Sequence, residues 1–278
     1  MAFVLIIHDY DCNFVAIMKK SLILVTNDDG LFAPGIKALV EVAKKFGEVV
    51  VVAPDSPQSG QGHAITIESP LRLKKIHFME EVEAYECNGT PVDCVKLGKH
   101  VLLKDRKIDL CVSGINHGSN AAINIIYSGT MSAAMEASLE GIPSIGFSLL
   151  DYSFDADFEP SKIIAENLID YILKKGMEHG SLLNVNIPKL KLADIKGMKV
   201  CRQGNARWVE EFKEGMDPRG QKYYWLTGKF INEDEGKDTD VWALDNGYVS
   251  IVPSDHDLTL YKAIPTLTSL EKLNIHAG

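Results

Sequence analysis

The chain contains the apolar run LILVT at residues 22–26, closed at once by NDDG at residues 27–30. A strand that is apolar on both faces is typical of a parallel sheet covered by helices on each side. Pro34 and the apolar spacing after it indicate a helix that ends at Gly47, and residues 49–53 form the next buried strand. Together these segments make a βαβ unit of about 30 residues, the building block of open α/β folds.

The same alternation continues along the chain. Further apolar runs predict buried strands at 108–112, 143–149 and 183–187. Helical spacing predicts helices at 90–103, 130–140 and 161–174. Short alternating segments predict a β excursion at 64–73 and 82–87, and strand-like stretches separated by polar loops return at 222–226 and 248–252. We therefore expect an α/β fold: a Rossmann-like, doubly wound, mostly parallel sheet with a β-rich C-terminal extension at about 198–278.

Composition narrows the possible functions. The 278 residues carry a formal net charge of −9, which argues against nucleic-acid polymers as partners because binding a phosphate backbone needs a basic surface. No apolar run approaches the roughly 20 residues of a membrane span. The five cysteines form no CxxC pair, which argues against a zinc site and suits reduced thiols in the cytoplasm. They are Cys12, Cys87, Cys94, Cys111 and Cys201. The last three lie in apolar stretches and are expected to be buried.

The N-terminal segment stands apart from this pattern. Residues 1–17 hold a short apolar run followed by polar residues, and Met18 precedes the first strong strand. We expect residues 1–17 to be an extension without a role in the fold and residues 18–278 to form one α/β domain. An extra strand at 1–17 is the alternative, and an insoluble or inactive protein beginning at Met18 would support it.

Polar clusters follow three of the predicted strands, where ligands bind in open α/β sheets. They are NDDG at 27–30, SPQSGQGH at 56–63 and SGIN at 113–116. Asp28, Asp29, a loop serine and Asn116 would form an all-oxygen site, which suits Mg²⁺ or Mn²⁺. A fourth cluster, SGT at 128–130, begins a predicted helix whose free backbone N–H groups favour a phosphate. A dication beside a helix N-terminus indicates phosphoryl hydrolysis.

Each cluster by itself has a simpler structural explanation. An Asp-Asp-Gly sequence is more often only a turn, and Ser128 at a helix start is by default an N-cap. His63, His117 and His256 are candidates for acid–base roles, but loop histidines are more often merely exposed or packed. The functional interpretation depends on the convergence of the clusters at one edge of the sheet.

Five blocks, in order, resemble the signatures of the SurE (survival protein E) nucleotidase family. They are ILVTNDDG (23–30), APD with QSG (53–60), NGTPVDCV (88–95), SGINHGSN (113–120) and YSGTMSAAMEA (127–137). Thr239-Asp240 and GYVSI (247–251) resemble the C-terminal strand region of the family, so the resemblance spans about 21–255.

The resemblance implies a cytoplasmic enzyme that removes phosphate from nucleoside 5′- and 3′-monophosphates, and in some relatives from short polyphosphate. It implies one divalent cation per subunit, Mg²⁺ or Mn²⁺, held by the catalytic pair Asp28 and Asp29 together with Ser59 and Asn116. The residues expected to bind substrate are Asn120, Ser128, Gly129 and Thr130. It further implies that the C-terminal extension is exchanged between subunits of a homodimer or homotetramer.

The expected mechanism is metal-assisted, in-line attack of water on the phosphorus of a phosphomonoester, without a covalent intermediate. Chemistry through an aspartyl-phosphate would need a second Asp two positions after the first, whereas Asp28 and Asp29 are adjacent. An oxidoreductase is disfavoured because no GxGxxG follows the first strand. A nucleotide-binding module without turnover remains open from the sequence.

Overall fold

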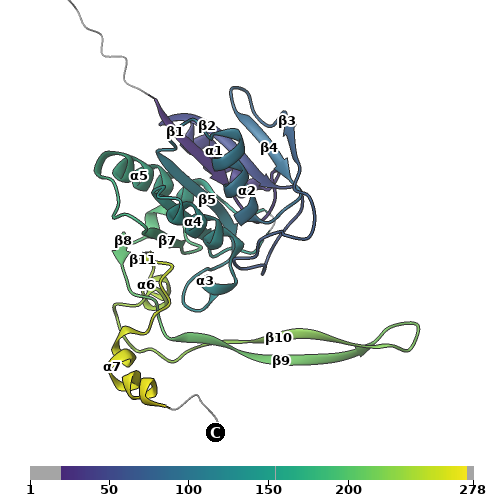
Figure 1. The fold of residues 1–278 in the computed structure, drawn as a ribbon, viewed down its shortest axis with the longest axis vertical. Coiled ribbons are helices and arrows are strands. Elements are labelled where there is room, and N and C mark those ends of the chain that lie inside the picture. The colour runs from purple at the N-terminus through teal and green to yellow at the C-terminus, as the bar shows by residue number, and fades with distance from the viewer. Residues whose placement is uncertain (1–19, 154, 274–278) are drawn as a thin grey trace, which may run out of the picture.

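The computed structural model describes residues 20–153 and 155–273, built around a nine-stranded sheet in the order β3-β4-β2-β1-β5-β6-β7-β11-β8 (Figure 1). Its strands are β1 (Ser21–Thr26), β2 (Gly47–Pro54), β3 (Leu73–Ile76), β4 (Glu83–Cys87), β5 (Leu110–His117), β6 (Ser144–Leu149), β7 (Leu182–Ile187), β8 (Met198–Val200) and β11 (Val249–Ser254). All neighbours are parallel except β3–β4 and β7–β11. The predicted doubly wound, mostly parallel sheet is confirmed. The segment 1–17, expected to be an extension, lies outside the described residues.

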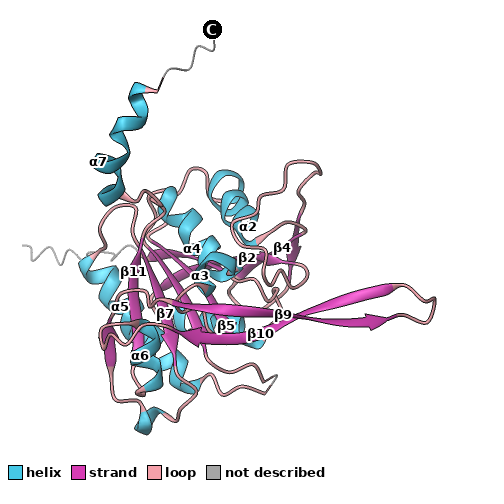
Figure 2. Cartoon of the chain, turned by 90° about the horizontal axis from the view of Figure 1, so that it is seen from below, coloured by secondary structure: helices cyan, strands magenta, loops and turns pink. Residues whose placement is uncertain are grey.

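Helices cover both faces of the sheet (Figure 2). α1 (Pro34–Ala43) and α5 (Glu159–Lys175) pack on one face, where Ile23 and Val25 of β1 point. α2 (Pro91–Leu97) and α4 (Gly129–Leu139) pack on the other face, against Leu22 and Leu24. Successive side chains of a strand point to opposite faces, which is why the run at 22–26 is apolar throughout.

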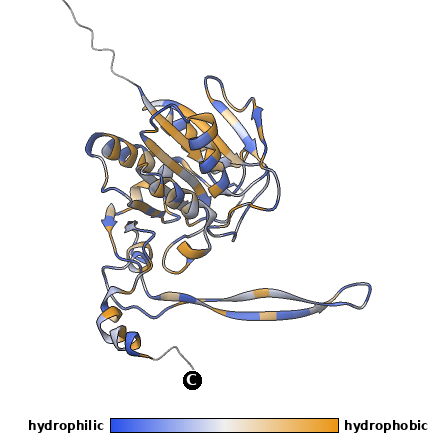
Figure 3. Ribbon diagram, in the orientation of Figure 1, coloured by the Kyte–Doolittle hydropathy of each residue, from blue (hydrophilic) through white to orange (hydrophobic). Residues whose placement is uncertain are grey.

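The C-terminal extension is only partly β. β9 (Ala206–Met216) and β10 (Lys222–Asn232) form a long antiparallel hairpin that projects from the body of the protein (Figure 1). α6 (Asp240–Asp245) precedes β11, and residues 261–272 form helical turns, including α7 (Ile264–Leu267). Apolar residues lie along the projecting hairpin and along the last helical turns (Figure 3). The β-rich prediction is therefore correct for β8, the hairpin and β11, whereas residues 261–272 form helical turns.

Two other predictions need correction. Residues 64–72 form no strand, because side chains of the α2 N-terminus bind their backbone: the Thr90 hydroxyl donates to the Ala64 carbonyl at 2.7 Å and the Asp93 carboxylate accepts from Thr66 N–H. The cluster at 113–116 is not a loop after a strand but part of β5, which runs on to His117 through a bulge.

Other local expectations are confirmed. Thr90 caps α2, its hydroxyl accepting from Asp93 N–H, and a π-helical turn at 98–102 extends the helix almost to the predicted end. Cys94, Cys111 and Cys201 are buried thiols. Among the described residues, no helix has the length and apolar character needed to cross a bilayer.

Candidate metal and phosphate site

The predicted polar clusters meet at the carboxyl ends of β1, β2 and β5. The chain leaves β1 toward β2 on one side, and β5 lies on the other side of β1, so this is the switch point at which α/β sheets bind ligands. A cavity of about 240 Å³ opens there, and it is lined by five of the eight predicted site residues: Asp28, Ser59, Asn116, Asn120 and Ser128.

The two carboxylates at the end of β1 are largely withdrawn from water. Asp28 is 4% exposed, and the Thr130 hydroxyl donates a hydrogen bond to its Oδ1. Burial, together with the charge of Asp29, raises the pKa of Asp28 from 3.8 to about 6. Burial also raises the pKa of Asp29, against the opposing effect of His117. Among the described residues no lysine or arginine shifts the pKa of either carboxyl group, and His117 is the one basic side chain that acts on the pair.

The N-terminus of α4 lies directly against Asp28. Ser128 is its N-cap, with the Oγ accepting from Met131 N–H at 3.0 Å. A Cβ at Gly129 would lie 2.7 Å from the Asp28 Cβ, so only glycine allows the helix to approach this closely. The predicted phosphate-binding turn and the predicted metal ligand are therefore in contact. Thr130 is fully buried, and its hydroxyl binds Asp28 rather than lining the cavity.

Ser59 reaches the cavity on a loop fixed by several contacts. The Gln58 N–H donates to the Asp28 carbonyl at 2.7 Å, and the Gly62 N–H donates to the Tyr127 carbonyl at 3.1 Å. One residue further, His63 Nε2 lies 2.9 Å from a carboxylate oxygen of Glu136 on α4. These contacts connect the loop to both β1 and α4.

The bulge in β5 turns Asn116 toward the cavity. Its Nδ2 donates to the Gly118 carbonyl at 3.0 Å, which directs the amide and leaves Oδ1 as an acceptor. The next residue, His117, donates its backbone N–H to Asp29 at 3.4 Å, and its ring packs edge-on against Phe158. β5 thus supplies one neutral oxygen ligand and one contact to the carboxylate pair.

These residues fit a hard divalent cation. A carboxylate pair with one buried member and no lysine or arginine partner favours a compensating cation. The cavity also presents the hydroxyl of Ser59 and the amide of Asn116, and oxygen ligands of this kind suit Mg²⁺ or Mn²⁺. Within the described part of the chain, no three or more His, Cys, Asp or Glu side chains are grouped so that they could hold a metal ion.

Comparison with known proteins shows the family of the chain. Residues 23–210 match the family model described as Survival protein SurE. The chain belongs to the SurE family. A protein of Christiangramia forsetii named 5′-nucleotidase SurE is 61% identical over 253 residues, covering 90% of this chain and 97% of that protein. Another 5′-nucleotidase SurE, from Flavobacterium psychrophilum, is 58% identical over 253 residues, with 91% and 98% covered.

A solved structure of the SurE family has the same fold. The crystal structure of the SurE protein from Aquifex aeolicus matches with a TM-score of 0.79 at 43% identity, covering 90% of this chain and 100% of that one. The resemblance inferred from the sequence blocks is confirmed. The relatives also confirm the expectation of an enzyme of the phosphoric monoester hydrolase class.

Beside the site of this SurE-family protein lies a buried network of asparagine side chains that the sequence did not predict. Asn120, expected to bind substrate, donates its backbone N–H to Asn186 Oδ1 and its side-chain Nδ2 to Ser148 Oγ, both at 2.8 Å. Asn184 in turn donates to the Asn120 carbonyl at 2.8 Å. These contacts fix Asn120 over the ends of β6 and β7. The signal in the sequence was the pair of asparagines at i and i+2 in the otherwise apolar strand LLNVNI.

The histidines take different places around this SurE site. His117 lines the cavity, whereas His63 pairs with Glu136 and His256 is exposed beside Asp255. Two aromatic side chains missed by the sequence, Tyr152 and Trp208, also line the cavity. Trp208 comes from the base of the distant hairpin, and no local pattern in the sequence connects it with β1.

Proposed function

We propose that this SurE-family enzyme hydrolyses the phosphate ester of nucleoside monophosphates with the help of one divalent cation. The observation that carries the proposal is the contact between Asp28 and the N-terminus of α4. Through this contact, a carboxylate pair that favours a bound cation and a helix N-terminus that favours a bound anion lie at one cavity. A phosphomonoester bound to a dication matches both halves of such a site.

Asp28, Asp29, Ser59 and Asn116 would hold the cation, either Mg²⁺ or Mn²⁺, one per subunit. When bound, the cation supplies Lewis-acid polarisation of the phosphoryl group and makes water a better nucleophile. Asp28 and Asp29 contribute to catalysis by holding this charge beside the reacting phosphorus.

The other residues act on the substrate directly. The Gly129 N–H group in the first turn of α4 is free of intrahelical bonds and would bind a phosphate oxygen, while the backbone N–H and hydroxyl of Thr130 hold Asp28 beside it. Ser128 and Asn120 line the same cavity and would orient the ester. Water attacks the phosphorus in line with the leaving alcohol, and the orientation of the phosphate by α4 favours this geometry.

The proposal includes 3′-monophosphates and short polyphosphate, because all these substrates present a terminal phosphoryl group to the same cation and helix end. It also places the enzyme in the cytoplasm, since the cysteines among the described residues are free thiols buried in the core.

We further propose a homodimer or homotetramer assembled through the C-terminal extension. β9 and β10 pair only with each other in the described structure, and a two-stranded hairpin alone is marginally stable in water. Its exposed side chains include Phe212, Tyr224 and Trp225, at 68%, 59% and 67%. A second copy would cover these apolar side chains.

The experiment is phosphate release from 5′-AMP and 3′-AMP with Mn²⁺, with Mg²⁺ and with EDTA. We expect release that needs the metal and is lost in Asp28→Asn. Asp170→Asn, on the outer surface of α5, is the matched control and should keep full activity, because Asp170 makes only an exposed ion pair with Lys174. Binding of AMP without release under any metal would instead identify a nucleotide-binding module.

A further inference from the structure

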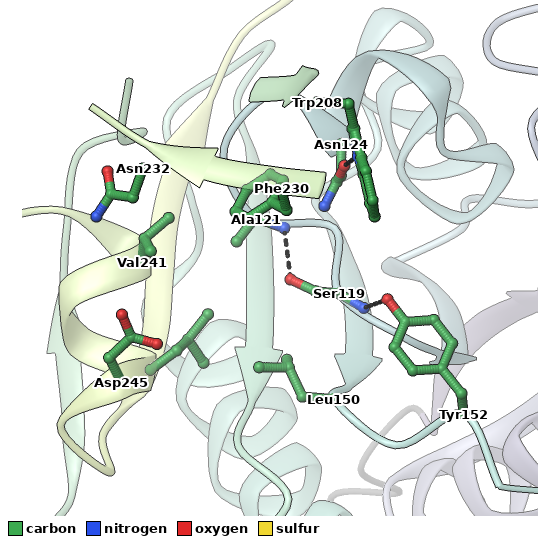
Figure 4. A pocket seen from close by; sticks show the side chains of 11 residues that line it. Ser119, Ala121, Asn124, Leu150, Tyr152, Trp208, Phe230, Asn232, Val241 and Asp245 are labelled. Atoms are coloured by element: carbon green, nitrogen blue, oxygen red, sulfur yellow. Dashed lines mark hydrogen bonds between the residues drawn. The ribbon is translucent and has the colours of Figure 1, made fainter. Parts of the chain in front are cut away.

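A second cavity, of about 380 Å³, adjoins the metal and phosphate site (Figure 4). The two cavities share four lining residues, Ser119, Asn124, Tyr152 and Trp208. A ligand whose phosphate lies beside Asp28 can therefore extend past these side chains into the second space. Cavities of about this size are typical of sites for small organic ligands.

The walls of this second cavity come from distant parts of the chain. Val241 and Leu244 of α6, 8% and 7% exposed, form one side. Trp208 and Phe230 close it from the hairpin base, with ring centroids 5.5 Å apart. Figure 4 shows Trp208 and Tyr152 across the space from Val241 and Asp245.

Hydrogen bonds fix these walls in position. The Trp208 indole N–H donates to Asn124 Oδ1 at 2.8 Å, which holds the ring at the boundary between the two cavities. The buried Asp240 carboxylate accepts from Ala122 N–H and Gly204 N–H, each at 2.8 Å. It thereby joins the loop of the phosphate site to the start of the hairpin. The cavity is a preformed part of the fold.

The chemistry of the lining selects among ligands. Aromatic and aliphatic side chains dominate it, and among the described residues its one charged group is the Asp245 carboxylate, which would repel a second phosphate. The flat ring of any nucleobase can stack on a Trp or Phe side chain, whichever base it is. A carboxylate and the nearby Asn232 amide suit the amino and ring N–H groups of a nucleobase.

We propose that this cavity is the nucleoside subsite, in which the base of a substrate nucleotide packs against Phe230 and Trp208 while its phosphate lies beside Asp28. The inference rests on the proposed nucleotidase function and assigns recognition of the substrate's nucleoside to the base of the hairpin.

A rival space lies on the other side of Trp208, where Leu226 and Glu210 of the hairpin face Gly60. We favour the first cavity because Val241 and Leu244 in its wall are buried and Phe230 is 37% exposed, whereas Leu226 is 64% exposed on the projecting hairpin. The two spaces give a matched pair of variants on one strand, Phe230→Ala and Leu226→Ala.

The test compares kcat/KM for 5′-AMP with that for ribose 5-phosphate, which lacks the base, in the full-length protein with Mn²⁺. In the wild type AMP should be the better substrate. Phe230→Ala should lower the ratio of the two values by about tenfold, mainly through KM for AMP, and Leu226→Ala should leave the ratio unchanged. An unchanged ratio in Phe230→Ala, or a loss in Leu226→Ala alone, would overturn the assignment.

Adenosine provides a second probe that needs no variant. It should inhibit hydrolysis of ribose 5-phosphate competitively, because it fills the nucleoside subsite and leaves the phosphate position empty. Absence of inhibition by adenosine would reject the subsite while leaving the phosphatase proposal intact. Absence of phosphate release from both esters under any metal would instead reject the proposed function itself.

Discussion

Two buried aspartates in this protein should respond in opposite ways to the same substitution. Asp28 lies beside another carboxylate without a basic partner. Asp240 is fully buried, but it accepts three backbone hydrogen bonds at 2.8 Å, from Ala122, Gly204 and Val241. We expect Asp28→Asn to stabilise the metal-free protein and Asp240→Asn to destabilise it.

The magnitude for Asp28 follows from its pKa, which rises from 3.8 to about 6 on folding. Each pKa unit corresponds to about 1.4 kcal/mol, so ionised Asp28 disfavours the metal-free folded state by about 3 kcal/mol at neutral pH. Asparagine removes the charge and can still accept from the Thr130 hydroxyl. For a chain of this size the gain corresponds to a Tm increase of about 5 °C as an order of magnitude.

The pH dependence has a definite sign. Because folding raises the pKa of Asp28, this carboxyl group does not lower the free energy of unfolding well below about pH 4, where it is protonated in both the folded and the unfolded state. The cost grows as pH rises toward 6 and is constant above that. The stability advantage of Asp28→Asn in EDTA should therefore be complete at pH 7.5 and reduced to about a third at pH 4.5.

The magnitude for Asp240 comes from its hydrogen bonds. Bonds to a charged acceptor contribute about 1.5–3 kcal/mol each, and an asparagine amide would direct its NH₂ group at an N–H donor. We expect a net loss of about 3 kcal/mol and a lower Tm at every pH near neutrality.

Thermal unfolding in EDTA, followed by circular dichroism at pH 4.5 and pH 7.5, measures both effects. Adding Mn²⁺ should raise the Tm of the wild type far more than that of Asp28→Asn, because only the wild type retains the full cation site. A Tm of Asp28→Asn equal to or below that of the wild type at pH 7.5 would refute the argument that the carboxylate pair is held at an energetic cost until a cation binds.

Three further substitutions test parts of the site and of the assembly. Gly129→Ala should lower kcat/KM for AMP by about 100-fold, because the added Cβ would displace Asp28. Phosphate release at saturating Mn²⁺ measures this loss, and normal activity would contradict the close contact between Gly129 and Asp28. Glu136→Gln, which weakens the anchor of the Ser59 loop at His63, should raise the Mn²⁺ concentration for half-maximal activity by roughly tenfold with little change in kcat, and an unchanged metal titration would show that the anchor is dispensable. Trp225→Ser should reduce the oligomer mass in light scattering, whereas the exposed Tyr171→Ser on α5 should not.

Local sequence patterns predicted the core of the fold because each apolar run there is buried on both faces. The run at 22–26 alternates between the two helical layers, so its composition alone reveals its environment. Pro34 and Thr90 likewise mark helix starts through backbone chemistry that acts within one turn.

Prediction failed where distant groups replace local structure. Residues 64–66 alternate like a strand, but the α2 capping residues Thr90 and Asp93 occupy their backbone groups. The bulge in β5 needs the neighbouring strand β6, with which Asn116 pairs again beside Ser148. Neither effect is visible in the segment itself, because its cause lies elsewhere in the chain.

The candidate site shows the same division. Asp28, Asn116 and Ser128 were found because strand ends and helix starts have local signatures, and parallel strands bring those ends to one edge. Trp208 could not be found in this way. It is held at the site by contacts between distant segments: Asp240 joins the loop at Ala122 to the start of the hairpin, and Asn124 accepts from the Trp208 indole, and such contacts leave no periodic pattern in the sequence.

The hairpin consequently has two environments along its length. At its base, Trp208 and Phe230 are held against the body of the protein and border the substrate cavities. Further out, Phe212 and Trp225 are exposed and need a partner surface. Since both environments share one pair of strands, a shift of the outer part in an assembled oligomer would move Trp208 at the entrance to the nucleoside subsite. Assembly should then affect KM for nucleotides more than KM for ribose 5-phosphate, which does not reach past Trp208.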